Sequence, residues 1–262
     1  MEYILIAVAA LFVSGMTLYS GFGLGTLLMP VFALFIPVEA AVAATAVVHG
    51  ANSVIKASFM GKRADRGLAV RFGIPALLAA FVGAALLGVV SKFPPLAEYE
   101  LFGRTAVVTP IKLLMGVLIL GFALMELLPK FRGLKFDRKY LVPGGLMSGF
   151  FGGLSGHQGA LRAAFLVKAG VSTEAYVGTN AVIALMVDTA RITVYGAMAL
   201  GGGFSALSAP QVKYMMLAGI VAAFCGVFVG SKFVHKVTMD VVQTLTGILL
   251  LGIGVALGAG VI

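Results

Sequence analysis

The sequence predicts an all-α protein that crosses a membrane several times. Of its 262 residues, 60% are hydrophobic and only 11% are charged, whereas soluble domains carry about 25% charged residues. Long apolar stretches recur along the whole chain, and the two halves repeat one pattern. This composition excludes a water-soluble enzyme. It predicts a polytopic membrane protein of about ten helical segments, arranged as two inverted-topology repeats.

Ten apolar segments are the candidates for membrane helices. A helix rises about 1.5 Å per residue, so about 20 residues are needed to cross a hydrocarbon core of about 30 Å. Segments 26–37 and 160–170 reach only about 18 and 16 Å and are too short to cross. Whether 3–19 and 140–153 span fully or re-enter is left open. The full set is 3–19, 26–37, 40–60, 68–90, 111–128, 140–153, 160–170, 174–200, 211–231 and 238–261.

Each of the two short segments follows a glycine-rich break. Residues 20–25 read SGFGLG, and residues 155–159 read SGHQG. A helix broken at membrane depth is tolerated only where its backbone is buried in protein or lines a cavity. The sequence therefore predicts a discontinuous helix pair inside the protein in each half of the chain.

Basic residues are concentrated in three short loops, at 61–71, 129–139 and 231–237. Loops rich in Lys and Arg stay on the cytoplasmic side of a membrane. The loops at 91–110 and 201–210 are then outside, as are both termini. The net charge of +9 is thus a signal of orientation in the inner (cell) membrane, and it does not indicate a nucleic-acid-binding protein.

The two halves of the chain align when one is shifted by 135 residues, which places Glu39 on Glu174. The first repeat is 1–128, the basic linker is 129–139, and the second repeat is 140–262. Each copy contains one broken pair and three full spans, which is an odd number of crossings. The second copy therefore begins on the opposite side of the membrane from the first. Inverted repeats with a discontinuous helix in each half are typical of secondary transporters, whose substrate site lies near the midplane.

The repeated pattern is a glycine-rich break, a short apolar segment, an acidic helix start and then a helix of small residues. Pro37-x-Glu39 with Ala43-Ala44-Thr45, and Ser172-Thr173-Glu174 with Gly178-Thr179-Asn180, carry it. Over nearly the whole chain it resembles the TauE/SafE sulfite exporter family, also called the four-toluene-sulfonate uptake permease family. The resemblance implies a carrier of sulfite, thiosulfate or organosulfonates, driven by the proton gradient and working in export. Members of the family commonly have Gly-Gly-Gly where this chain has Gly156-His157-Gln158, which suggests a specialised substrate.

The breaks are the first candidates for the substrate site. Each following half-helix points its N-terminus at mid-membrane, where free N–H groups and partial positive charge favour an anion. The alternative is that the glycines serve only close packing or a hinge. The residues expected to bind substrate here are Ser20, Gly21, Gly23 and Gly25 in the first break and Gly156, His157, Gln158 and Gly159 in the second.

Arg162, about one turn into the second half-helix, is a further candidate. Its guanidinium can bind two oxygens of an oxyanion, while His157 can bind the anion or carry a proton near neutral pH. The alternatives are that Arg162 extends toward the cytoplasmic interface and that His157 only caps a helix.

A polar stripe follows the helix predicted at 40–60. Thr45, His49, Asn52 and Lys56 are spaced i, i+4, i+7 and i+11, which places them on one helix face. His49 and Asn52 fall near mid-depth, whereas Lys56 lies near the cytoplasmic end, and we expect its side chain to extend to that interface. We expect Thr45, His49 and Asn52, with Asn180 as the repeat mate of Thr45, to complete the pocket. Interhelical hydrogen bonding is the alternative role.

Asp188 and Arg191 are three residues apart on the helix predicted at 174–200 and can form an ion pair. A neutralised pair is suited to a structural or gating role, and we expect that role here.

Other classes of protein fit the sequence less well. With three histidines and one cysteine, the chain shows no nucleophile–base motif and no metal cluster, so no catalytic residue, metal or cofactor is expected. The expected partners are a small anionic substrate and the lipid bilayer, with no nucleic acid, and a homo-oligomer is left open. A carrier of another small anion, a divalent-metal carrier and an anion channel are the alternatives.

Overall fold

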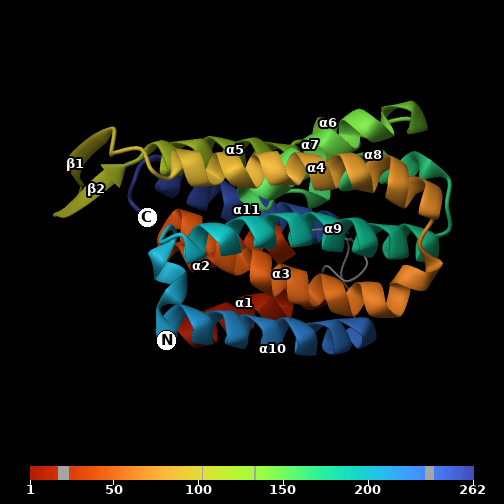
Figure 1. The fold of residues 1–262 in the computed structure, drawn as a ribbon, viewed down its shortest axis with the longest axis horizontal. Helices are drawn as coiled ribbons and strands as arrows, with labels where there is room; N and C mark the ends of the chain where they lie inside the picture. Colours follow the sequence, from red (N-terminus) through yellow and green to blue (C-terminus); the bar gives the residue numbers. More distant parts are fainter. Residues whose placement is uncertain (17–23, 102, 133, 234–238) are drawn as a thin grey trace.

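The protein is described by a computed structural model that covers residues 1–16, 24–101, 103–132, 134–233 and 239–262. It consists of long helices that run side by side and a two-stranded hairpin (Figure 1). The elements are α1 (Glu2–Met16), α2 (Leu24–Ala33), α3 (Val38–Met60), α4 (Arg66–Val90), β1 (Ala97–Leu101), β2 (Arg104–Val108), α5 (Pro110–Leu127), α6 (Pro129–Arg132), α7 (Leu141–Ser155), α8 (Gly159–Leu166), α9 (Thr173–Leu200), α10 (Pro210–Phe233) and α11 (Met239–Gly258).

The all-α membrane fold predicted from composition is confirmed. Within the described residues, five helices are long and apolar enough to cross a membrane, namely α3, α4, α5, α9 and α10. Their outward faces carry exposed apolar side chains, such as Leu78 of α4, Val117 of α5 and Val221 of α10, which are 59%, 59% and 55% exposed. An exposed apolar surface of this extent suits contact with lipid.

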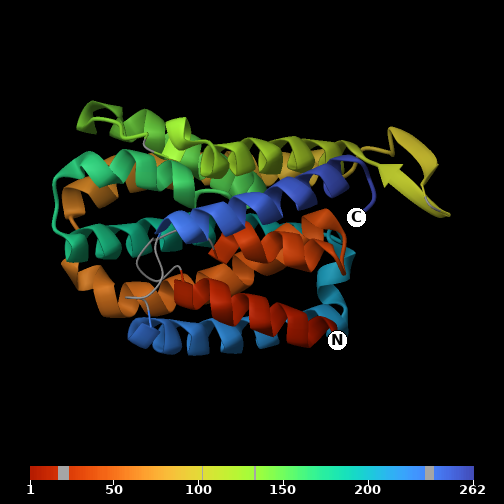
Figure 2. The same cartoon turned by 180° about the vertical axis from the view of Figure 1, so that it is seen from behind.

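The helix ends gather at two opposite ends of the molecule. The hairpin, the N-terminus and the C-terminus lie at one end, called here the hairpin end (Figures 1 and 2). The α3–α4 turn and the segment 129–140 lie at the other, called here the basic end. The pair α1–α2 starts and finishes toward the hairpin end, whereas α7–α8 starts and finishes toward the basic end.

Helix contacts between the two halves are reciprocal. α1 packs against α10, and α7 packs against α4. α3 packs against α9, and α5 packs against α11. If α1–α5 are exchanged in order with α7–α11, the contact of α1 with α10 becomes the contact of α7 with α4. The same exchange leaves the α3–α9 and α5–α11 contacts unchanged. This is the arrangement expected of two repeats related by a two-fold axis.

Glycines allow the backbones of α4 and α7 to touch. A Cβ atom added at Gly149 would lie 2.0 Å from the carbonyl oxygen of Ala76, and one at Gly153 would lie 2.1 Å from that of Ala80. Gly145 meets the Phe72 carbonyl oxygen in the same way, at 2.4 Å. In lipid, where helices gain little from the hydrophobic effect, small residues let dispersion contacts hold helices together.

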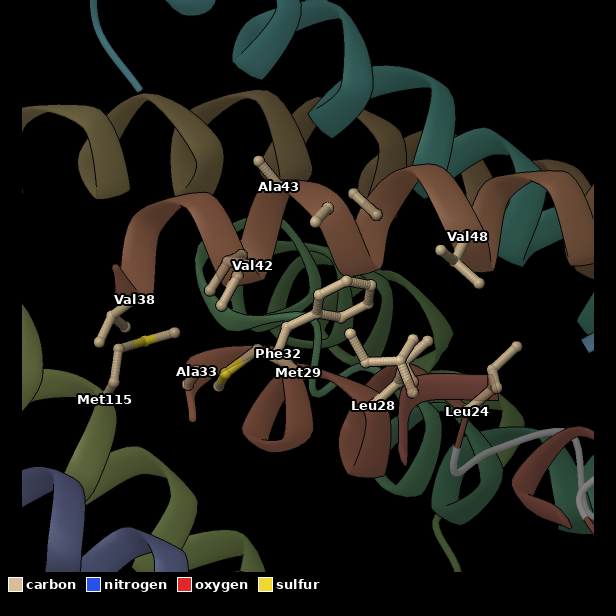
Figure 3. Packing of buried hydrophobic residues seen from close by; sticks show 14 of the residues in the cluster. Leu24, Leu28, Met29, Phe32, Ala33, Val38, Val42, Ala43, Val48 and Met115 are labelled. Atoms are coloured by element: carbon tan, nitrogen blue, oxygen red, sulfur yellow. The ribbon is translucent and has the colours of Figure 1, made fainter. Parts of the chain in front are cut away.

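The short helix α2 is buried in protein, as a half-helix at membrane depth must be. Leu28, Met29 and Phe32 are all fully buried. Figure 3 shows them packed beneath the valines and alanines of α3, with Val42 and Val48 above them. The small residues of α3 leave room for the large ones of α2.

The hairpin at 97–108 was not predicted, because this stretch was interpreted only as an outer loop. β1 and β2 pair antiparallel, with Ala97 opposite Val108, and Gly103 adopts a φ of 74° at the turn. Hydrogen bonds hold the C-terminal residues to the hairpin, since the Val107 N–H donates to the Gly260 carbonyl and the Tyr99 hydroxyl donates to the Ala259 carbonyl. The sequence signal for this hairpin was Gly103, which stands between two stretches of residues that favour β-strands.

The close contact of α4 and α7 predicts that Gly149→Ala is destabilising. The added methyl group meets backbone, which cannot move aside, so the free energy of unfolding should fall by about 1–3 kcal/mol although Ala favours helix by about 1 kcal/mol. The control is Gly121→Ala, where no atom lies within 4 Å of the added Cβ. Thermal unfolding in detergent measures both. An unchanged midpoint in Gly149→Ala would contradict the described packing.

Candidate functional site

A small polar cavity lies between α3, α8 and α9. Its volume is about 30 Å³, which is room for about one water molecule. Apolar residues of α9 form the remaining wall. The polar lining consists of His49, Asn52, Ser53 and Lys56 from α3, Arg162 from α8 and Asn180 from α9.

The polar stripe on α3 faces this cavity. His49, Asn52 and Lys56 lie on the one face that their helical spacing predicted, and all three line the cavity together with Ser53. Lys56 was expected to extend to the cytoplasmic interface and lies in the cavity wall. Lys56 is only half-buried. Thr45 is fully buried and is not part of the lining, and its hydroxyl has no hydrogen-bond partner among the described residues. Thr45 was expected to complete the pocket, and it lies instead in the buried interior outside the cavity lining.

Arg162 turns into the protein and is 1% exposed. Its Nε donates to Asn180 Oδ1, and its Nη1 lies 3.1 Å from Gln158 Oε1. The interfacial orientation considered for this side chain is not the one adopted. Arg162 instead brings a fixed positive charge to the cavity wall, one turn after the second break.

Asp188 is the centre of a buried hydrogen-bond network, called here the Asp188 cluster. Its Oδ2 lies 2.7 Å from His49 Nδ1 and accepts from the Ser53 hydroxyl at 2.7 Å. Its Oδ1 accepts from Arg191 Nε at 3.0 Å and lies 2.8 Å from Nη2. The predicted Asp188–Arg191 pair is thus present, with both side chains 0% exposed.

The cluster joins the two halves of the chain. His49 and Ser53 come from α3, and Asp188 comes from α9. Ser53 and Asp188 are 135 residues apart, which equals the offset predicted between the two halves, so positions predicted to be equivalent meet here. Sequence analysis did not identify Ser53 or the link between His49 and Asp188. The 135-residue offset itself was the signal, because a two-fold axis brings equivalent positions of paired helices together.

The second break lies against the start of α2. A Cβ added at Gly25 would lie 3.1 Å from the Gly156 carbonyl oxygen and 3.4 Å from the His49 ring. One added at Gly156, whose φ is 82°, would lie 2.9 Å from Arg191 Nη1. The break, α2 and the Asp188 cluster therefore adjoin. Of the first break, Ser20, Gly21 and Gly23 lie outside the described residues.

His157 lies beside the break and does not line the cavity. Its ring stacks on Phe122, with centroids 5.1 Å apart and planes at 12°, and its Nδ1 lies 3.1 Å from the Ser155 carbonyl oxygen. This contact is the one expected of a capping group. Its Nε2 has no hydrogen-bond partner among the described residues.

Two buried donors near the break lack partners in the described part of the chain, namely Gln158 Nε2 and Arg191 Nη1. His157 Nε2 also lacks a partner, and it is an acceptor in the neutral ring because Nδ1 donates to the Ser155 carbonyl oxygen. Gln158 is otherwise held in place, since its carbonyl oxygen accepts from the Ser148 hydroxyl at 3.0 Å. Gly159, the first residue of α8, follows directly. Buried polar groups are nearly always hydrogen-bonded, so a concentration of spare donors indicates a place where a polar ligand is received.

The family model described as "Sulfite exporter TauE/SafE" matches residues 3–257. The matched range includes both broken pairs, the cavity and the Asp188 cluster. No curated protein matches the chain.

The Asp188 cluster predicts a large difference between single and double substitutions. Asp188→Leu leaves the Arg191 charge buried without its partner and should lower the free energy of unfolding by about 3–5 kcal/mol, whereas Asp188→Leu with Arg191→Met should recover most of that loss. The control is Asp137→Asn in the exposed pair with Lys168, 3.5 Å apart, where a change below about 1 kcal/mol is expected. Thermal unfolding in detergent compares them, and a double variant no more stable than the single one would argue against the pairing.

Proposed function

Because the chain belongs to the TauE/SafE sulfite exporter family, we propose that it carries a small sulfur-containing anion across the membrane by alternating access. Sulfite, thiosulfate and organosulfonates are the candidate substrates. The family consists of membrane transporters of sulfur anions such as sulfite and not of enzymes, and the chain is a multi-pass membrane protein. We further propose that the direction of transport is export and that transport is coupled to protons, and the identity of the anion is also part of this proposal.

The observation that carries the proposal is the charge of the cavity. Lys56 and Arg162 line it, and Asn52, Asn180 and Ser53 add neutral hydrogen-bonding groups. Its described lining contains no carboxylate. Asp188, beside it, is already bonded to His49, Ser53 and Arg191. A guanidinium and an ammonium beside neutral donors suit an oxyanion.

The position of the cavity supports the proposed orientation. Its basic residues lie on the half of α3 and on the part of α8 that lead to the basic end. If the basic loops are cytoplasmic, the cavity receives its ligand from the cytoplasm, which suits an exporter with both termini outside. Its present volume of about 30 Å³ requires α3, α8 and α9 to separate when a sulfur oxyanion enters. Two repeats, 1–128 and 140–262, rocking about the linker 129–139 would produce that movement.

A divalent-metal carrier is the alternative from a different class. His49 and Asp188 are side chains that bind metals, and they lie 2.7 Å apart. Among the described residues, however, no three His, Cys, Asp or Glu side chains form a group that could hold a metal ion. The cations around Asp188 favour an anion, and the experiment below includes nickel for this reason.

Ligand-induced stabilisation tests the substrate class. Purified protein in detergent is heated with sulfite, thiosulfate, an alkyl sulfonate, phosphate or nickel. We expect one of the sulfur anions to raise the unfolding midpoint and to bind Arg162→Gln about 10- to 150-fold more weakly, since a hydrogen bond to a charged group contributes about 1.5–3 kcal/mol. Asn52→Ala should weaken binding more than His157→Ala, because only Asn52 lines the cavity.

Arg71→Gln is the matched control for Arg162→Gln, since Arg71 is an exposed arginine of α4. It should bind the anion as the parent protein does. Stabilisation by nickel with no response to any anion would overturn the proposal in favour of a metal carrier.

Proton coupling predicts a distinct behaviour for His49. Its imidazole is bonded to Asp188, with Ser53 in the same network, and faces Arg191, Lys56 and Arg162 nearby. An imidazole can exchange a proton near neutral pH. In proteoliposomes we expect an imposed proton gradient to drive saturable sulfite flux. His49→Gln should still bind sulfite but lose the response to the gradient. Flux that follows only the electrical potential and does not saturate would identify a channel.

A further inference from the structure

A second and larger cavity lies at the hairpin end and is called here the vestibule. Its volume is about 540 Å³. It is bounded by the start of α3, the end of α4 and the loop after α9. Glu39, Ser91, Lys92, Met198 and Phe204 line it, together with the glycines at 201–203.

The cavity and the vestibule lie along the same faces of α3 and α9. On α9, Asn180 and Ala184 line the cavity and Met198 lines the vestibule. Asp188, Arg191 and Tyr195 fall between them at spacings that keep one helix face. On α3, Lys56 and His49 line the cavity and Glu39 lines the vestibule. Their separations of seven and ten residues are about two and three helical turns, which again keep one face. One continuous seam between the two helices therefore joins the two openings.

Tyr195 separates the vestibule from the Asp188 cluster. It lies one turn beyond Arg191 toward the hairpin end and is 2% exposed. Its hydroxyl donates to the Gly153 carbonyl oxygen, near the end of α7. Its ring lies 5.9 Å from that of Phe204, which is itself part of the vestibule wall. Tyr195 thus joins α9, the second broken pair and the loop after α9 at one point.

On the cluster side of Tyr195 lies a donor without a partner. Arg191 Nη1 is buried and has no hydrogen-bond partner in the described part of the chain, and it lies beside Gly156 at the break. Lys92 stands at the vestibule. From the basic end to the hairpin end the positive groups are Lys56 and Arg162, then Arg191, which is paired with Asp188, and then Lys92, which shares the vestibule lining with Glu39. A succession of cationic groups of this kind suits the passage of a small anion.

We propose that the vestibule is the outer mouth of the anion path and that Tyr195 is its outer gate. Opening the gate breaks the hydrogen bond from Tyr195 to Gly153 and the ring contact with Phe204, which lets a sulfur oxyanion pass from Arg191 to Lys92. The inference rests on the proposed function. It adds the route that the anion takes to the outside and the residue that closes this route. The gate residue acts on access and does not itself bind the substrate in the cavity.

Thiol labelling tests both parts of the proposal. Cys225 is the single cysteine of the chain, so Cys225→Ser gives a background without thiols. Ser91→Cys reports on the vestibule and Ala184→Cys on the cavity. Val117→Cys, on the apolar outer face and 59% exposed, is the control for a thiol facing lipid. A negatively charged, membrane-impermeant methanethiosulfonate is applied to the outside of intact cells.

We expect Ser91→Cys to be labelled at least 10-fold faster than Ala184→Cys or Val117→Cys. Adding Tyr195→Ala should speed labelling of Ala184→Cys at least 10-fold, and Tyr195→Phe, which keeps the ring and loses the hydrogen bond, should speed it several-fold. Tyr214→Ala, on the exposed face of α10, should leave the rate unchanged. If Tyr195→Ala does not fold, as judged by size-exclusion chromatography, the Tyr195→Phe comparison decides.

Two results would overturn the inference. Labelling of Ser91→Cys only in inside-out vesicles would show that the vestibule is not an outer mouth. An unchanged rate at Ala184→Cys in both Tyr195 variants would show that Tyr195 is not the gate. Sulfite should slow labelling of Ala184→Cys in the Tyr195→Phe background. If the labelling pattern holds but sulfite has no effect, the path and gate stand and the proposed substrate is wrong.

Discussion

In the hydrocarbon core of a bilayer, a backbone N–H or C=O group finds no water to pair with, so a helix that breaks there must be enclosed by protein. In the described part of this chain, a break at 156–158 separates α7 from α8, and α2 is likewise too short to cross; the long helices are arranged around them. α2 is covered by α3, with Phe32 and Leu28 fully buried, and α7 lies directly on the backbone of α4. Glycine makes this enclosure possible, because any Cβ at Gly149 or Gly153 would overlap a carbonyl oxygen of α4.

A second constraint acts on charge. Asp188 and Arg191 are completely buried, and a buried charge is tolerated only when it is paired and hydrogen-bonded. His49 and Ser53, which come from the other half of the chain, complete the set of groups bonded to Asp188. The carboxylate therefore holds α3 to α9 at the point where the two halves of the chain meet. In the proposed transport cycle, movement of the halves relative to each other would change the partners of Asp188, so the network lies where the proposed transport and proton exchange would be linked.

Local patterns in the sequence predicted much of the site. The spacing of His49, Asn52 and Lys56 placed them on one face, and the structure turns that face to a cavity. Arg162 was identified by its place after the break. The pattern did not reveal Ser53, the hydrogen bond between His49 and Asp188, or Tyr195. It also gave His157 the same weight as Gln158, whereas the ring of His157 stacks on Phe122 and only Gln158 contacts Arg162.

The sequence by itself determined which segments are helical and apolar, where two of them break, and which loops carry the positive charge. These properties depend on the local composition and periodicity of the chain, and they need no knowledge of distant residues. Only the tertiary structure decided which polar groups face one another. Asp188 meets Ser53 across 135 residues and His49 across 139 residues, and Tyr195 meets Gly153 across 42 residues. Such pairs depend on how whole helices cross and rotate against each other, and helix rotation is set by the packing of every neighbour together.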